Sequence, residues 1–278
     1  MEKKRNNILV IVLLSLIMIS CSSEDSNIET QTIHIPDANF ETYLIDNGID
    51  SDGIINQKVL LSDVKNVECI NLITLNSEKR VRSLKGIEGF SNLKRLFAVD
   101  NNLTKIDLSK NIMLDTINLM SNNLVDIKGL QNLTNLKWLN LSFNFFEEFT
   151  LNNSSVTNIL MTHNELKSFK ANKAINLETV NLLSNKIDLI DFSKNTKLQL
   201  INVSNNKLTN IVLGLKEELF YLSLFENSLT NLNVSDFDKL SYLIVERNPK
   251  LFCIKVKKGQ NIPLLKLSNY QKVNENCI

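Results

Sequence analysis

Few residues of this 278-residue chain have types and spacings that could perform catalysis or bind a metal ion. Its two histidines, His34 and His163, lie on different segments, so neither a cysteine–histidine pair nor a metal cluster can be assembled from them. Adjacent glutamates such as Glu147 and Glu148 fit a solvated surface. The seven glycines lie singly, and none belongs to a phosphate-binding loop. The sequence therefore predicts a protein that is not an enzyme and that needs no cofactor and no metal.

The segment DSDG at residues 50–53 is the one stretch that invites a calcium interpretation. Asp50, Asp52 and Gly53 fall where an EF-hand loop has its third and fifth ligands and its glycine. Gly48 and Val59 would then hold the first and twelfth positions, and neither can supply a carboxylate. We expect a simple turn here, with calcium binding as the alternative.

The first residues have the pattern of an export signal. A basic start precedes an apolar run from Ile8 to Ile19, which is too short to span a bilayer, and Cys21 follows. This arrangement resembles a bacterial lipoprotein signal, whereas an ordinary secretory signal is the alternative. The resemblance implies that residues 1–20 are removed, that Cys21 is lipidated and that residues 21–32 form a flexible tether. It also implies an outer-membrane protein anchored by lipid, which we place at the cell surface.

The rest of the chain is one repeated pattern. Eight consecutive segments, from LKRLFAVDNNL at Leu93 to LSYLIVERNPK at Leu240, recur every 20 to 22 residues, with apolar residues at the first, fourth and sixth positions. Asparagine stands at the ninth position of each: Asn101, Asn122, Asn144, Asn164, Asn185, Asn206, Asn227 and Asn248.

Alternating apolar residues predict a short parallel strand with one buried face, followed at once by a turn. An asparagine amide both donates and accepts hydrogen bonds, so it can satisfy backbone groups of its own coil and of the next. We therefore expect a ladder of asparagines. The second half of each repeat is too short for a long helix, which favours extended or 3₁₀ segments. A net charge of +1 and the absence of a nucleic-acid-binding motif argue against a nucleic-acid partner.

This pattern is identified as the leucine-rich repeat, and the resemblance covers residues 60–278. It implies a solenoid with a parallel β-sheet on its concave face and short turns, 3₁₀ or extended segments on its convex face. Residues 35–64 are similar to the opening block of secreted Bacteroidetes proteins of this family. We expect an N-terminal helical cap at 33–66, one degenerate and eight regular repeats at 67–249, and a C-terminal cap at 250–278.

Four cysteines fit this scheme. With Cys21 assigned to lipid, Cys253 and Cys277 bracket the C-terminal segment, and an exported protein lies where disulfides persist. We expect these two to form a bridge, as the resemblance to the family's C-terminal cap also implies. Cys69 is expected to stay a buried thiol.

The repeat register predicts which side chains face outward from the concave sheet. Exposed aromatic residues with a polar rim are typical of protein-binding surfaces. The candidate ligand-binding residues are Trp138, Phe143, Leu200, Tyr221, Phe225, Tyr242, Ile244 and Arg247. Trp138 with Phe143 is expected to form a smaller second cluster. These residues predict recognition of a protein partner of unknown identity, although the rings could instead merely cover the sheet.

The C-terminal cap is rich in lysine, and this gives the alternative function. Lys250, Lys255, Lys257, Lys258 and Lys266 are among the cationic residues of the cap. Such a cluster could favour an anionic glycan or an anionic membrane surface. The alternative is thus a structural or glycan-associated envelope lipoprotein whose contact surface is the basic cap.

Overall fold

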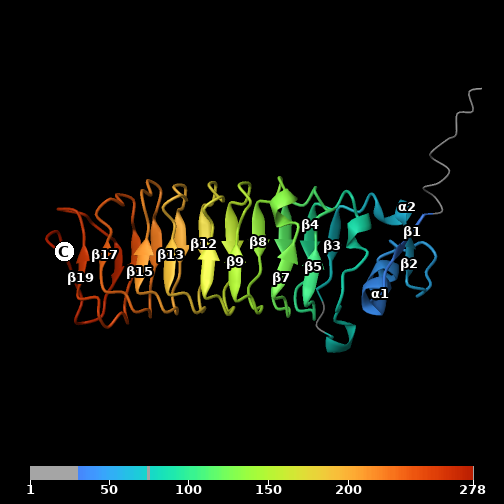
Figure 1. Cartoon of the computed structure of the whole chain (residues 1–278), viewed down its shortest axis with the longest axis horizontal. Helices are drawn as coiled ribbons and strands as arrows, with labels where there is room; N and C mark the ends of the chain where they lie inside the picture. Colours follow the sequence, from blue (N-terminus) through green and yellow to red (C-terminus); the bar gives the residue numbers. More distant parts are fainter. Residues whose placement is uncertain (1–30, 74–75, 278) are drawn as a thin grey trace, which may run out of the picture.

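The computed structural model describes residues 31–73 and 76–277, which form one elongated solenoid (Figure 1). The chain winds in coils stacked along the long axis, with the helix α1 near one end and the C-terminus at the other. The signal-like residues 1–20 and Cys21 lie outside the described residues. None of the described helices is long and apolar enough to cross a membrane.

The N-terminal cap consists of β1 (Thr32–His34), α1 (Ala38–Asp46), β2 (Lys58–Leu60) and α2 (Leu61–Val64), with β1 and β2 antiparallel. Asp37 starts α1, because its carboxylate accepts from the backbone N–H groups of Asn39 and Phe40 at 3.0 and 3.1 Å. The buried Phe40 packs against Phe90 of the first coils, with ring centroids 6.1 Å apart. Tyr43 places its hydroxyl 2.9 Å from the backbone nitrogen of Asn71, so the cap covers an N–H group of the first strand of the main sheet.

Within the described residues, ten short parallel strands form the main sheet, whose solvent side we call the sheet face. In spatial order they are β3 (Cys69–Asn71), β4 (Arg95–Phe97), β6 (Thr116–Asn118), β8 (Trp138–Asn140), β10 (Asn158–Leu160), β12 (Thr179–Asn181), β14 (Leu200–Asn202), β16 (Tyr221–Ser223), β18 (Tyr242–Ile244) and β20 (Leu264–Lys266). Each strand pairs with the next in an unshifted register, so equivalent repeat positions form straight rows across the sheet.

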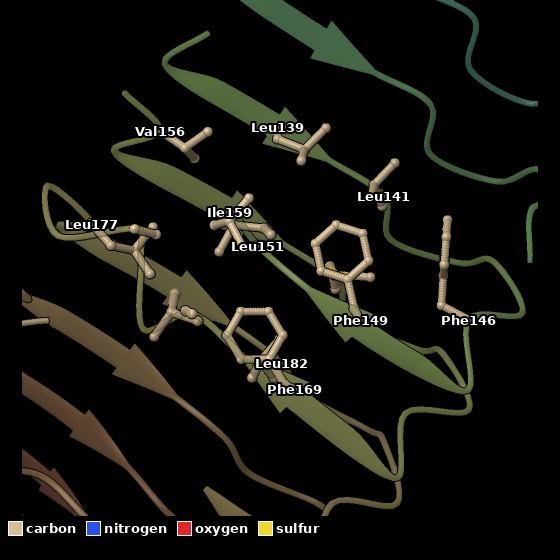
Figure 2. Close-up of a cluster of buried hydrophobic side chains, with 14 of the residues drawn as sticks. Leu139, Leu141, Phe146, Phe149, Leu151, Val156, Ile159, Phe169, Leu177 and Leu182 are labelled. Carbon is tan, nitrogen blue, oxygen red and sulfur yellow. The ribbon is translucent and has the colours of Figure 1, made fainter. Parts of the chain in front are cut away.

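The core lies between the sheet and the returning half of each coil. The middle residue of most sheet strands is fully buried, as Leu139 and Ile159 are. Figure 2 shows these leucines and isoleucines facing Phe149 and Phe169, which come from the return strands. Phe149 and Phe169 stack at 6.3 Å, so the aromatic layer continues from one coil to the next.

The return segments are extended or 3₁₀, which confirms the expectation from their length. Short parallel pairs run through β5 (Lys105–Asp107) with β7 (Asp126–Lys128), β9 (Glu148–Thr150) with β11 (Ser168–Lys170), β13 (Leu189–Asp191) with β15 (Asn210–Val212), and β17 (Leu232–Asn233), β19 (Cys253–Lys255) and β21 (Lys272–Asn274). The 3₁₀ turns are η2 (Ser77–Lys79), η3 (Ile87–Gly89) and η4 (Leu130–Asn132). Gly129 begins η4 with φ +90°, where a Cβ would collide with the backbone of Ser109.

The last coil is closed covalently. Cys253 of β19 and Cys277 form a disulfide with their Cα atoms 5.8 Å apart, which confirms the predicted bridge. Gln271 adds a hydrogen bond from its side-chain nitrogen to the carbonyl of Val245 at 3.1 Å. Cys69 is a free, half-buried thiol on β3.

Candidate binding surface

The ninth-position asparagines bind the coils to one another. Asn185 is representative: its Oδ1 accepts from the N–H of Leu166 at 3.0 Å, and its Nδ2 donates to the carbonyls of Met161 at 2.9 Å and Leu182 at 3.0 Å. A single carboxamide thus forms hydrogen bonds with backbone groups of two successive coils. All eight asparagines accept from a backbone N–H in this way. Because all of these asparagines except the half-buried Asn206 are buried, the ladder fixes the spacing of the turns that flank the sheet face.

A second ladder runs along the other edge of the solenoid, and the sequence analysis missed it. Its members donate to two or more backbone carbonyls, one or two of them in the preceding coil: Asn111, Asn153, Asn195, Lys216 and Gln260. The 42-residue spacing of the three asparagines, which is two repeats, is the signal that could have found it.

Lys216 is the unusual member of this second ladder. Its ammonium is buried and donates to the carbonyls of Phe192 at 2.9 Å, of Leu215 at 3.2 Å and of Leu213. Burial lowers the pKa of Lys216 to about 8, and the charge of Asp191 opposes that shift.

The eighth residue of each regular repeat adopts the left-handed helical conformation. These residues have φ between 52° and 58°: Asp100, Ser121, Phe143, His163, Ser184, Asn205, Glu226 and Arg247. Apart from Arg247, which bonds a serine hydroxyl, each donates its N–H to a carbonyl of the following coil, as Phe143 does to Thr162 at 2.8 Å. Bulky residues pay about 1–2 kcal/mol for this conformation. The side chains of this column project next to one another along one rim of the sheet face.

The strand register brings three of the predicted binding residues into one row. Leu200, Tyr221 and Tyr242 are direct neighbours on β14, β16 and β18. The rings of the two tyrosines lie 5.9 Å apart and are tilted by 34°. Tyr242 is 41% exposed, and Leu200 and Tyr221 are half-buried. Because the alternate residues point into the core, this row lies on the sheet face.

Phe225, Ile244 and Arg247 lie beside that row. The guanidinium of Arg247 sits 5.0 Å from the centroid of the Phe225 ring, a cation–π geometry. It also forms an exposed ion pair with Glu226 at 3.3 Å. Ile244 is half-buried on β18, next to Lys266 of β20. We call the six residues Leu200, Tyr221, Phe225, Tyr242, Ile244 and Arg247 the sheet-face patch.

The structure places Trp138 and Phe143 in different surroundings. Trp138 is half-buried on β8, whereas Phe143 is 47% exposed in the left-handed column five residues later. Phe143 stacks on His163 of the next coil, with centroids 4.4 Å apart and ring planes 6° apart. Within the described residues, Phe143 thus has His163 as its ring partner, and no ring contact joins Trp138 to Phe143.

The acidic side chains of the N-terminal cap hold the loop and turn that follow α1. Glu41 is fully buried, and its Oε1 accepts from the N–H groups of Asn56 at 2.9 Å and Lys58 at 3.1 Å. Asp52 caps the turn by accepting from the N–H of Ile54 at 2.8 Å. Burial, followed by the charge of Asp52, raises the pKa of Asp50 to about 6. In residues 31–73 and 76–277, no group of three or more His, Cys, Asp or Glu side chains is arranged to hold a metal ion.

The lysines of the C-terminal cap are mostly exposed. Lys257 forms an ion pair with Asp238 of the preceding coil at 2.9 Å. The other exposed members are Lys250, Lys255, Lys258, Lys266 and Lys272.

Comparison with solved structures identifies the architecture. The functional domain of InlJ from Listeria monocytogenes superposes with a TM-score of 0.59 at 20% identity, over 88% of this chain and 62% of that one. Internalin C2 from the same organism gives a TM-score of 0.59 at 18% identity, over 78% and 96%. The fold is a leucine-rich repeat solenoid. YopM from Yersinia enterocolitica is also similar, with a TM-score of 0.50 at 16% identity, over 66% and 48%.

No family model and no curated protein matches the sequence of this leucine-rich repeat chain. The chain spans 62% of the length of the InlJ domain. Since identities near 20% establish the fold alone, the function must be argued from the surface of this molecule.

Proposed function

We propose that this leucine-rich repeat protein is a lipid-anchored, non-catalytic cell-envelope protein that recognises a protein partner through the sheet-face patch. The observation that carries the proposal is the in-register row of Leu200, Tyr221 and Tyr242, which lies on the sheet face beside Phe225 and Arg247. Tyrosine and arginine are among the residues most enriched at the energetic centres of protein interfaces.

The structural surroundings of the sheet-face patch favour partner binding over a role in merely covering the sheet. The rings of the two tyrosines pack 5.9 Å apart on paired strands, which limits the side-chain freedom that is lost when a partner binds. Glu226 and Arg247 supply a charged rim around an apolar centre.

The anchor rests on the sequence, in which a basic start and a short apolar run precede Cys21. Metabolic labelling with a palmitate analogue should mark the wild-type protein and not Cys21→Ser. Protease shaving of intact cells should then degrade the protein if it lies on the outer surface. Protection from shaving would contradict the surface location.

The binding test compares wild type with a Tyr221→Ala/Tyr242→Ala double variant as bait for surface proteins of neighbouring or host cells. A partner that binds wild type should bind the double variant at least tenfold more weakly when both proteins are purified. The melting temperature should fall only slightly, because both tyrosines project away from the core and their removal costs mainly the contact between the two rings. Equal affinity for the two proteins would refute the assignment of the site.

The exposed lysines of the C-terminal cap support a second candidate, contact with an anionic glycan or membrane surface. Lys257 is already paired with Asp238, so the variant for this test is Lys255→Gln/Lys258→Gln/Lys266→Gln. Loss of binding to an anionic polysaccharide in this variant, with retention in the tyrosine double variant, would favour the second candidate.

A further inference from the structure

A groove along the asparagine ladder lies away from the sheet-face patch. It is open, has a volume of about 550 Å³ and extends over the coils from Asp100 to Ser184. Its floor contains the ladder asparagines. One wall is formed by the left-handed column and the other by the tenth-position residues: Asn102, Asn123, Phe145 and Glu165. We call it the ladder groove.

The ladder groove contains an exposed aromatic platform. Phe143 and His163 stack face to face across neighbouring coils, so the outer face of each ring points along the solenoid axis. The next residues of the column are Ser121 on one side and Ser184 on the other. Because both are small, they leave room beside the outer ring faces. Phe145, 53% exposed, adds a third ring to the opposite wall.

The polar side chains around this platform are available to a ligand. Within the described residues, the carboxamides of Asn102 and Asn123 and the hydroxyls of Ser121 and Ser184 make no hydrogen bond, although their side chains line the groove. Each of these groups can both donate and accept. The ladder asparagines below them are saturated by backbone groups and hold the floor rigid.

The charges at the ends of the groove are already neutralised. Arg80 makes two hydrogen bonds to the carboxylate of Asp100, at 2.7 and 2.8 Å. Glu165 is paired with Lys186 of the next coil. No unpaired cation among the described lining residues offers a site for a phosphate or a sulfate. A neutral ligand therefore fits better than an anion.

The backbone at Phe143 is a further sign that the ring is there for binding. Its φ of 56° lies in the left-handed region, where asparagine is readily accommodated and bulky residues are not. Asn205 occupies the same position of its repeat, which shows that the fold accepts asparagine there. The strained backbone thus carries an exposed aromatic ring that contributes nothing to the core.

We propose that the ladder groove binds a neutral oligosaccharide. Sugar rings present one face of C–H groups, which an aromatic ring face attracts, and a periphery of hydroxyl groups that both donate and accept. In the groove, the rings of Phe143 and His163 complement the C–H face of a sugar. The side chains of Asn102, Ser121 and Asn123 complement its hydroxyl groups. A protein partner is less well matched, because every lining residue except Phe143 and Phe145 has a polar or charged side chain, whereas the sheet-face patch has an apolar centre.

The test is calorimetric titration of the whole protein with four neutral hexasaccharides: maltohexaose, cellohexaose, laminarihexaose and mannohexaose. At least one should bind with a Kd of about 1 mM or tighter. Phe143→Asn should weaken that binding at least tenfold while the melting temperature is unchanged or higher, since asparagine relieves the backbone. Tyr221→Ala/Tyr242→Ala, the matched control, should bind the sugar as wild type does.

Three results would overturn the proposal. The first is that none of the four hexasaccharides binds at concentrations up to about 10 mM. The second is that sugar binding is unchanged in Phe143→Asn, and the third is that it disappears in the tyrosine double variant. Hexagalacturonic acid serves as the anionic probe, and tighter binding of this acid than of every neutral sugar would also contradict the argument. The protein-binding proposal is tested by a different variant, so the two can fail separately.

Discussion

Replacing Asn185 by leucine should destabilise the solenoid by about 3 kcal/mol, and the hydrogen bonds show why. The change removes three bonds, to the N–H of Leu166 and to the carbonyls of Met161 and Leu182. Leu182 keeps a partner, because its carbonyl also accepts from Asn206 at 3.0 Å. Two buried backbone groups are then left unsatisfied, and each costs about 1–3 kcal/mol. The apolar surface gained by leucine offsets a small part of this cost.

The variant Asn185→Asp tests the accepting role of this side chain separately from its donating role. Aspartate can still accept from Leu166, but its carboxylate would face the carbonyl oxygen of Met161, so the folded state favours the protonated acid. A folded pKa above the unfolded value of about 3.9 means that stability is present at low pH and is lost as pH rises. The variant should therefore approach wild type near pH 4 and fall below it at pH 7.

Urea denaturation measures both effects. Trp138 is the only tryptophan and lies on β8, two strands of the sheet from β12, so its fluorescence reports unfolding without touching the substituted site. Asn210→Leu is the control, because Asn210 is exposed and pairs in register with Leu189, which shows that leucine is accepted there. It should change stability by less than about 0.5 kcal/mol. Equal effects of Asn185→Leu and Asn210→Leu would refute the role of the ladder.

Three other outcomes are expected. Because the folded pKa of Asp50 is raised to about 6, stability should fall as pH rises from about 4 to 6, and Asp50→Asn should be more stable at pH 7 by about 1–2 kcal/mol. A urea midpoint for Asp50→Asn no higher than wild type at pH 7 would contradict this. The lowered pKa of Lys216, about 8, predicts that the free energy of unfolding rises with pH between about 8 and 10. Lys216→Gln should show less of this rise. The same pH dependence in wild type and variant would exclude a contribution of Lys216. Reduction of Cys253–Cys277 should cost about 3 kcal/mol and lower the melting temperature, whereas a Cys253→Ser/Cys277→Ser variant should not respond to reductant.

The sequence predicts the solenoid well because its information is periodic. Apolar residues at fixed spacing, such as Leu139 and Ile159, must share one buried face, and the regular spacing of the asparagines locates the turn of each repeat. Tyr221 and Tyr242 could be placed side by side for the same reason, since equivalent positions of neighbouring repeats form rows.

The contacts that could not be predicted depend on local backbone conformation or on residues far apart in the sequence. Phe143 meets His163 rather than Trp138 because the left-handed conformation turns the eighth residue toward the rim. Lys216 was overlooked because a lysine in sequence suggests an exposed charge. In the structure its ammonium is buried, where the carbonyls of Phe192 in the preceding coil and of Leu213 and Leu215 accept from it. Glu41 has the appearance of a surface residue of α1 until the loop leading to β2 brings two N–H groups to it.

The C-terminal disulfide also determines how the protein would respond to mechanical force. The coils are joined along the solenoid axis by hydrogen bonds, so tension applied to the chain ends would detach them one at a time. Each detached coil of about 21 residues would release about 70 Å of extended chain. The segment between Cys253 and Cys277 would release none, because its ends are covalently joined. We expect a stepwise force–extension trace that gains one further step, of about the same length as the others, when the bridge is reduced.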